Sequence, residues 1–298
     1  MNLAKPPVSG WKPPPLSALR KEQLPVEIYR KFKKELGEVD SHLCLIDAAI
    51  QDLALAQKES PNGAAFLRQR TLEHGHRRLS TDNLDLHFAM RLAYTSQVAL
   101  LQSRLEQLCR ILKRHCLINV KLNEVAEGDF LRRTLWLIAA SREDEKLPAT
   151  IEETIALRYV DSLDLAVLDY YRIMRNLELH AVSDAKGNCS RAAADDNLTG
   201  YYSKIDVNRC KSELGYVPTL KGEMSFIDVL IVSKSCQRVA RSLCRSIINP
   251  QRDVEPELRR KFGSFAADRR LNAAKALMNQ TYLLDVADVE ALLYSLAW

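Results

Sequence analysis

An unbroken run of apolar residues in steps of three and four is the feature that most limits how this chain can fold. The run lies within residues 26–58 and continues for three to four heptads. Its members are Tyr29, Phe32, Leu36, Val39, Leu43, Ile46, Ile50 and Leu53. This spacing places all of them on one side of an α-helix. The sequence therefore predicts one long helix whose apolar side is covered by another helix.

The rest of the chain has the same helical period. Further helices are expected at residues 84–113, 128–141, about 151–180, 225–248, 258–278 and 286–296. Glycine and proline are few, with 10 and 11 residues, which favours helices throughout. We expect an all-α helical bundle in which the long apolar run packs within one chain. A dimerising coiled coil is the alternative use of that run.

Composition changes divide the chain into four regions. Prolines cluster in an N-terminal arm at 1–25, which Trp11 and Leu16 could dock onto a surface. The long helix and a shorter helical segment occupy 26–80, and a central region follows at 83–250. A C-terminal helical appendage occupies 255–298. Within the central region, the polar span 183–218 is long for a loop and should contain a short helix or hairpin.

Charge and cysteine content restrict the class of protein. The formal net charge of +5 permits a polyanionic partner but does not require one. None of the seven cysteines forms C-x-x-C or a zinc-ligand spacing, so we expect reduced thiols, no metal site and no cofactor. No apolar leader and no membrane-spanning window occurs, so a soluble, cytoplasmic protein without membrane contact is expected.

Residues 175–180 carry the pattern R-N-x-x-x-H near the end of a strongly periodic helix. Arginine forks onto phosphate oxygens, and histidine exchanges protons near neutral pH. Arg175 and His180 could therefore cleave RNA without a metal, while Asn176 orients a phosphate or the imidazole. Asn176 and His180 share a helical face, but Arg175 and His180 diverge by about 140°. Arg175 must reach around the helix, or the helix must end here.

The same spacing also arises by chance. With six histidines and abundant arginine, a bare R-x-x-x-x-H pattern is common in a chain of this length. Arg110 and His115 form a second match, without an asparagine after the arginine. The alternative interpretation of residues 175–180 is a solvated helix face without catalytic function.

The motif and its context resemble the HEPN superfamily. A long apolar helix precedes R-N-x-x-x-H, and a polar loop and another amphipathic helix follow it. The resemblance implies a HEPN-like domain at 83–250 and a metal-independent endoribonuclease with Arg175, Asn176 and His180 as catalytic residues. It also implies a homodimer with one composite cleft, a toxin or antiviral defence role, and an antitoxin or activator protein as a possible partner.

Two groups of residues could bind RNA near this motif. Cations recur in steps of four, three and four along the helix at 225–248, where they could follow an RNA backbone. Aromatic and basic residues in the polar span could stack on bases and hold phosphate. The candidates are Lys234, Arg238, Arg241, Arg245, Tyr201, Tyr202 and Lys204. Solvated charges and ordinary loop packing are the alternatives.

The sequence thus leaves two functional hypotheses. The first is an endoribonuclease that cuts RNA by attack of the 2′-OH, giving 2′,3′-cyclic phosphate and 5′-OH ends. The second is a non-catalytic helical module that binds protein or RNA through its heptad seams. A homodimer is expected from the long apolar run and from the face that Asn176 and His180 share.

Overall fold

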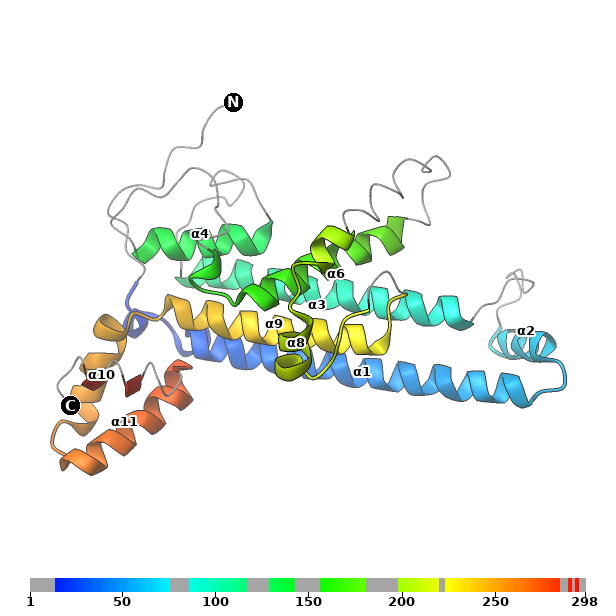
Figure 1. The fold of residues 1–298 in the computed structure, drawn as a ribbon. Helices are drawn as coiled ribbons and strands as arrows, with labels where there is room; N and C mark the ends of the chain where they lie inside the picture. Colours follow the sequence, from blue (N-terminus) through cyan, green and yellow to red (C-terminus); the bar gives the residue numbers. More distant parts are fainter. Residues whose placement is uncertain are drawn as a thin grey trace. The chain divides into compact units, whose positions relative to one another are not determined.

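The computed structural model describes residues 14–75, 86–116, 129–142, 156–180, 198–219, 223–284, 289–290 and 293–294. Every regular element in these ranges is a helix, so the predicted all-α class is confirmed (Figure 1). The α-helices are α1 (Pro25–Glu59), α2 (Gly63–Glu73), α3 (Leu86–Cys116), α4 (Phe130–Arg142), α6 (Ser162–His180), α8 (Val207–Arg209), α9 (Phe226–Ile247), α10 (Glu255–Phe262) and α11 (Ala267–Tyr282). The described ranges also contain two 3₁₀-helices, η1 (Leu16–Ala18) and η2 (Lys21–Gln23), and two π-helices, η5 (Cys210–Leu214) and η6 (Pro250–Val254).

Helix α1 follows the predicted apolar run from end to end. The first part of the run is buried within the chain, with Leu36 at 3% and Leu43 at 1% exposure. Burial of this first part confirms the prediction that the run packs inside a helical bundle. Further along, Ile46 is 43% exposed, so the later part of the run is not fully covered. Gly37 does not break the helix, and its carbonyl oxygen accepts a hydrogen bond from Ser41 Oγ at 2.8 Å.

The chain forms two compact units. Unit 1 comprises Met1–Glu35, Ser103–Leu165 and Cys236–Trp298, and unit 2 comprises Leu36–Gln102 and Ala166–Ser235. The unit boundaries fall inside α1, α3, α6 and α9, so each of these helices contributes residues to both units. These boundaries differ from those of the four regions predicted from composition. The division into four regions stays a prediction.

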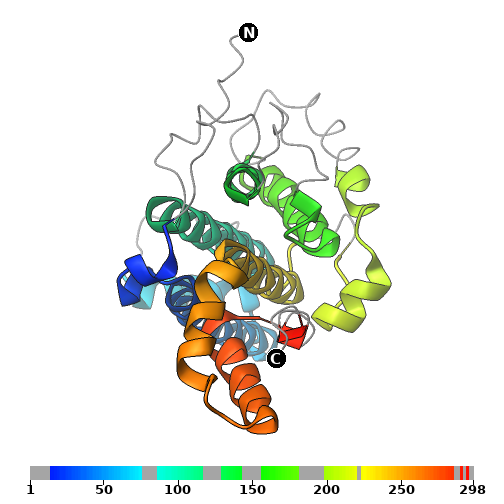
Figure 2. The ribbon, with the colours of Figure 1, turned by 90° about the vertical axis from the view of Figure 1, so that its left-hand side faces the viewer.

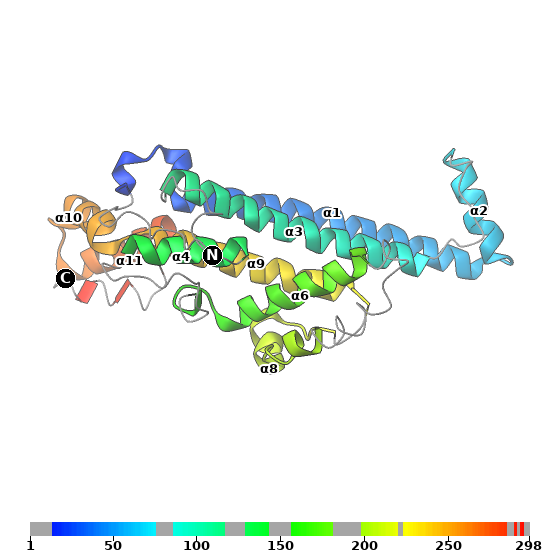
Figure 3. The same cartoon turned by 90° about the horizontal axis from the view of Figure 1, so that it is seen from above.

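Unit 2 contains segments of four helices joined by polar contacts. Helices α1 and α3 run side by side (Figure 3), and Gln97 Nε2 donates to the carbonyl oxygen of Val39 at 2.9 Å. Ser233 of α9 donates to Asp40 of α1 at 2.7 Å. On α6, the hydroxyl of Tyr171 donates to Asp228 of α9. These contacts join α6 to α9, α9 to α1 and α1 to α3, as in a four-helix bundle.

Unit 1 has an apolar cluster at its C-terminal end. Helices α10 and α11 lie next to each other there (Figure 2) and supply Leu258, Ala274 and Met278 to the cluster. Leu16 of the N-terminal arm packs into the same cluster. Its backbone N–H donates to Asp253 Oδ1 at 3.1 Å. The prediction that Leu16 docks the arm is therefore confirmed, whereas Trp11 lies outside the described residues.

Two predicted helix boundaries are wrong. Helix α6 begins at Ser162 rather than near 151, because a turn at 158–159 comes first and Asp161 Oδ1 accepts the N–H of Leu163 at 2.8 Å. Residues 151–155 lie outside the described ranges. The single helix expected at 258–278 is instead α10 and α11, separated by a turn at Gly263. A Cβ at that position would lie 2.5 Å from the carbonyl oxygen of Arg259.

The described part of the polar span, residues 198–219, contains short helices. Residues 198–202 are helical, and α8 and η5 follow. Asp206 begins α8 by accepting the N–H of Arg209 at 3.0 Å. Gly215 ends η5 with a φ of 84°, a conformation that favours glycine. The expectation of a short helix in this span is confirmed.

Most of the described cysteines are buried free thiols. Cys109, Cys210, Cys236 and Cys244 are buried, and Cys44 is exposed. Burial raises the pKa of the Cys109 thiol to about 12, which keeps it protonated and unreactive near neutral pH. No helix in the described part of the chain is both long enough and apolar enough to cross a lipid bilayer.

Candidate active site at the end of helix α6

Helix α6 carries the R-N-x-x-x-H motif in its last two turns. The apolar face of the helix is buried, with Leu163, Val167, Tyr170 and Met174 at 0–2% exposure. Arg175 and Asn176 come directly after the last of these residues and are half-buried. Packing of the apolar face therefore fixes the backbone on which the two candidate side chains stand.

The guanidinium of Arg175 folds back onto the side chain of its neighbour. Its Nε and Nη2 atoms donate to Asn176 Oδ1 at 3.1 and 2.7 Å. Its Nη1 atom donates to Gln102 Oε1 of α3 at 2.8 Å. These bonds, which are not its only contacts, go to neutral amide oxygens and so do not cancel the charge of Arg175. The structure thus brings Arg175 and Asn176 together.

His180 is the last residue of α6, and its side chain lies outside the described residues. The helix includes both Asn176 and His180, so their Cα atoms are one turn apart on the same face. The role of the imidazole as proton carrier stays a prediction.

Charged residues of α3 lie beside the end of α6. Glu178 lies inside the motif, and its Oε2 atom is 3.9 Å from Nη2 of Arg91. Arg91 also pairs with Glu223, and His87 Nε2 is 2.9 Å from Glu223 Oε2. A cavity of about 480 Å³ is lined by His87, Arg91, Tyr94 and Glu223 among others. Neither this charge cluster nor Gln102 was predicted from the sequence, because both depend on how α3 pairs with α6.

The predicted tyrosines have partners near the motif helix. The ring of Tyr202 meets that of buried Tyr170 edge-on, with 5.5 Å between centroids, and its hydroxyl donates to the carbonyl oxygen of Pro218 at 3.3 Å. Lys204 Nζ lies 5.1 Å from the ring centroid of Tyr201. Tyr202 therefore packs the span against α6, and stacking of Tyr201 on a base stays a prediction.

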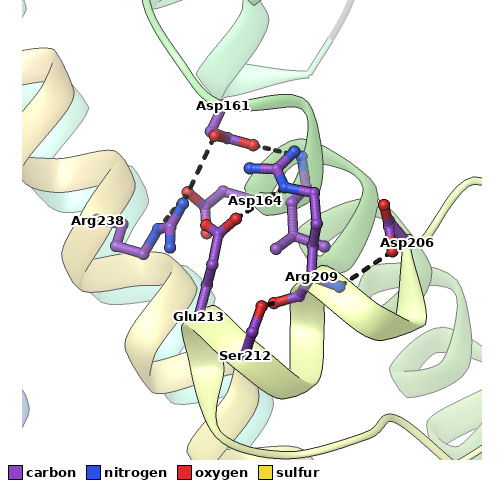
Figure 4. Close-up of polar contacts among 8 residues, drawn as sticks. Asp161, Asp164, Asp206, Arg209, Ser212, Glu213 and Arg238 are labelled. Carbon is purple, nitrogen blue, oxygen red and sulfur yellow. Dashed lines mark hydrogen bonds and ion pairs between the residues drawn. The ribbon is translucent and has the colours of Figure 1, made fainter.

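The cations of α9 also have intramolecular partners. Lys234 Nζ donates to the carbonyl oxygen of Leu214 at 2.6 Å. In unit 1, Arg238 Nε donates to Asp164 Oδ2 at 2.8 Å and its Nη2 is 3.6 Å from Asp161 Oδ2 (Figure 4). Arg241 and Arg245 are half-buried and have partners as well. RNA binding by these four cations stays a prediction and would compete with these contacts.

Figure 4 also shows a separate ion pair in unit 2, in which Arg209 Nε donates to Glu213 Oε1 at 2.7 Å.

The second R-x-x-x-x-H match lies in α3. Arg110 is 5.2 Å from the ring centroid of Phe130, and Nδ1 of His115 is 3.2 Å from Nε2 of Gln23. Arg110 and His115 thus contact different residues.

No family model matches the chain, and no curated protein or solved structure matches it. Among the described residues, no three histidine, cysteine or carboxylate side chains gather as a metal-binding group. The resemblance to the HEPN superfamily therefore depends on the motif at 175–180 and on the order of the helices.

Proposed function

We propose that this protein is a metal-independent endoribonuclease. The observation that supports the proposal is the pairing of Arg175 with Asn176 at the end of α6, where both side chains are half-buried. The side chain of an arginine held in this way is already ordered before a phosphate binds. A phosphate oxygen carries negative charge and an amide oxygen does not, so phosphate is attracted more strongly to the guanidinium and competes well with the amide oxygens that Arg175 now contacts.

In the proposed reaction the RNA supplies its own nucleophile. His180 takes the proton of the ribose 2′-OH, the 2′-oxygen bonds to the adjacent phosphorus, and the bond to the 5′-oxygen breaks. Arg175 stabilises the charge that builds on the phosphoryl oxygens. The leaving 5′-oxygen takes a proton from His180 of a second copy in a composite dimer cleft. The products are a 2′,3′-cyclic phosphate and a 5′-OH end.

The test is cleavage of RNA by the purified protein in EDTA. We expect the wild type to cut and His180→Ala to lose about 10²–10⁴-fold in rate, the usual contribution of general acid–base catalysis. His115→Ala is the matched control, since His115 belongs to the second R-x-x-x-x-H match and should be dispensable. A strict Mg²⁺ requirement, or an equal loss of cleavage rate in both variants, would show that His180 is not the acid–base catalyst.

We propose a toxin or antiviral defence effector as the biological role. Expression of the wild type should then slow growth, and His180→Ala should relieve this. An antitoxin or activator in the cells would change toxicity without changing cleavage by the purified protein, so growth and cleavage are measured separately. Sequencing of the 5′-OH ends formed during expression would identify the RNA.

A non-catalytic binding module is the second candidate. It is favoured by exposed large apolar side chains in unit 2, namely Leu45 at 68%, Leu55 at 57% and Leu92 at 46%. In this case Arg175 only joins α6 to α3. Equal growth of cells expressing the wild type and His180→Ala, together with no cleavage in vitro, would favour the module.

A further inference from the structure

The side chain of Gln102 connects two helices at the proposed site. Its Oε1 atom accepts from Nη1 of Arg175 at 2.8 Å, and its Nε2 atom donates to the carbonyl oxygen of Leu168 at 3.4 Å. Gln102 comes from α3, whereas Leu168 and Arg175 belong to α6. All three residues lie in unit 2. The amide is therefore held at both ends, with its oxygen directed at the guanidinium.

The backbone that carries Gln102 is fixed by packing. The neighbouring residues Val98 and Leu101 are fully buried at 0% exposure. A side chain on a fixed backbone loses little further conformational freedom when it forms a hydrogen bond. The hydrogen bond from Arg175 thus joins two elements that are each already held in place.

A guanidinium is a rigid planar fork, so fixing one nitrogen orients the others. With Nη1 held by Gln102, the Nε and Nη2 atoms form the edge that meets Asn176 Oδ1. This is the edge whose two parallel N–H donors arginine uses to bind two oxygens of a carboxylate or phosphate, although here both donors meet the single oxygen of Asn176. The amide oxygen of Asn176 occupies the position that a phosphate oxygen would take.

We propose that Gln102 is a positioning residue that holds Arg175 so that its Nε and Nη2 edge binds a phosphate oxygen in place of Asn176. The inference rests on the proposed ribonuclease function for its biological use, but anion binding can be tested without cleavage. Substrate displaces the side chain of Asn176 and leaves the bond to Gln102 intact.

The test measures how fast phenylglyoxal modifies Arg175 in the full-length protein, by peptide mass spectrometry with Arg172 of the same helix as internal reference. Inorganic phosphate is the probe. In the wild type we expect phosphate to protect Arg175 relative to Arg172. In Gln102→Leu we expect faster basal modification and at least about a tenfold higher phosphate concentration for half protection, because misplacement by about 1 Å can cost up to 10²-fold.

Gln97→Leu is the matched control. Gln97 also lies on α3 and also donates across to a neighbouring helix, at the carbonyl oxygen of Val39. This variant should keep the wild-type modification ratio and the wild-type phosphate protection. If it changes both as much as Gln102→Leu does, loss of any bond from α3 is sufficient and the positioning role is overturned.

Gln102→Glu keeps the size of the side chain and covers the case in which Gln102→Leu fails to fold. A carboxylate would grip Nη1 more strongly but would also compete with phosphate by its charge. We expect slow basal modification together with weak phosphate protection, a combination that unfolding does not produce. Equal protection in the wild type and Gln102→Glu, or no protection of wild-type Arg175 by phosphate, would overturn the proposal.

RNA cleavage separates this proposal from the proposed function. If the wild type cuts RNA, Gln102→Leu should lower kcat up to about 10²-fold while KM rises less, since orientation matters most in the transition state. If the wild type cuts no RNA but phosphate protection still depends on Gln102, the ribonuclease assignment fails and the anion site stands.

Discussion

Gln102 of α3 accepts a 2.8 Å hydrogen bond from Arg175 of α6, although the two residues are 73 positions apart in the sequence. The bond links the candidate phosphate-binding arginine to a helix outside its own motif. Activity of the motif should therefore depend on the pairing of α3 with α6, and not on residues 175–180 alone.

A buried carboxylate near the start of α9 should contribute strongly to stability. Asp228 is fully buried and accepts hydrogen bonds from Tyr171, from both the N–H and the hydroxyl of Thr219, and from both the N–H and the hydroxyl of Ser225. Asp228→Ala would leave these donors unpaired in the core. We expect the free energy of unfolding to fall by about 3–5 kcal/mol, because each buried donor left unpaired costs about 1–3 kcal/mol and several lose their partner.

Urea unfolding followed by circular dichroism measures this loss. Asp268→Ala is the control, because Asp268 is an exposed residue in the first turn of α11 and should change stability by less than about 1 kcal/mol. A similar small loss for Asp228→Ala would mean that the hydrogen-bond network around Asp228 contributes little to the folded state.

Alkaline pH should weaken the fold through the same network. Burial and the neighbouring Asp228 raise the pKa of Tyr171 well above its usual value of 10.0. The folded state therefore keeps this hydroxyl protonated after the unfolded chain has begun to ionise it. The contribution to stability is complete below the usual pKa and is lost as the pH rises from there toward the folded-state pKa.

Urea unfolding at several values between about pH 8 and pH 11 spans this onset. We expect the free energy of unfolding to decline more gently in Tyr171→Phe than in the wild type. Some decline should persist, because burial also raises the pKa of Tyr94 and Tyr282. Tyr294, at 89% exposure, is the control, and Tyr294→Phe should follow the wild-type curve. Identical slopes for Tyr171→Phe and the wild type would contradict this assignment.

Periodicity predicted the helices well because burial follows it. The first part of the apolar run in α1 is covered, and Leu43 shows the expected burial. The later part of the run differs, since Ile46 continues the same pattern but is 43% exposed. A pattern shows which side of a helix is apolar, but it does not show how far along the helix a neighbour extends.

The candidate site was only partly predictable. Arg175 and Asn176 were identified because they are adjacent in a recognisable motif. Gln102 was missed, since a single glutamine on a predicted helix has no sequence signal until the pairing of α3 and α6 is known. The charged ridge on α9 was visible from spacing, but the two aspartates that pair with Arg238 were not, because the register of α6 against α9 decides that contact.

A homodimer should use the exposed apolar residues of α1. Leu45 and Leu55 are 68% and 57% exposed in the single chain. The double variant Leu45→Ser, Leu55→Ser should therefore weaken self-association without loss of stability, because neither side chain packs in the core. Light scattering at micromolar concentration measures the mass. Leu43→Ala, at a position of 1% exposure, should instead destabilise the fold by about 2–5 kcal/mol. A monomeric wild type would exclude the composite dimer cleft.

Replacement of the two described motif residues should separate charge from orientation. Arg175→Lys keeps the positive charge but cannot fork onto two oxygens, so we expect a large loss of RNA cleavage. Asn176→Ala removes an amide that phosphate displaces from the Nε and Nη2 edge of Arg175 and leaves the arginine itself in place, so any loss should be smaller. Initial rates on one RNA substrate in EDTA measure both effects.

The ends of the cleaved RNA identify the nucleophile in the same reactions. Attack by the neighbouring 2′-OH should leave 2′,3′-cyclic phosphate and 5′-OH ends in the wild type and in any variant with residual activity. An RNA with a single 2′-deoxy residue at the cleaved position should resist cutting at that position, because it lacks the attacking oxygen. Arg172→Lys is the control for the arginine change, since Arg172 lies on the same helix and pairs with Asp169 at 3.4 Å. Products with 3′-OH ends, or equal losses in Arg172→Lys and Arg175→Lys, would show that Arg175 does not serve as the phosphate clamp.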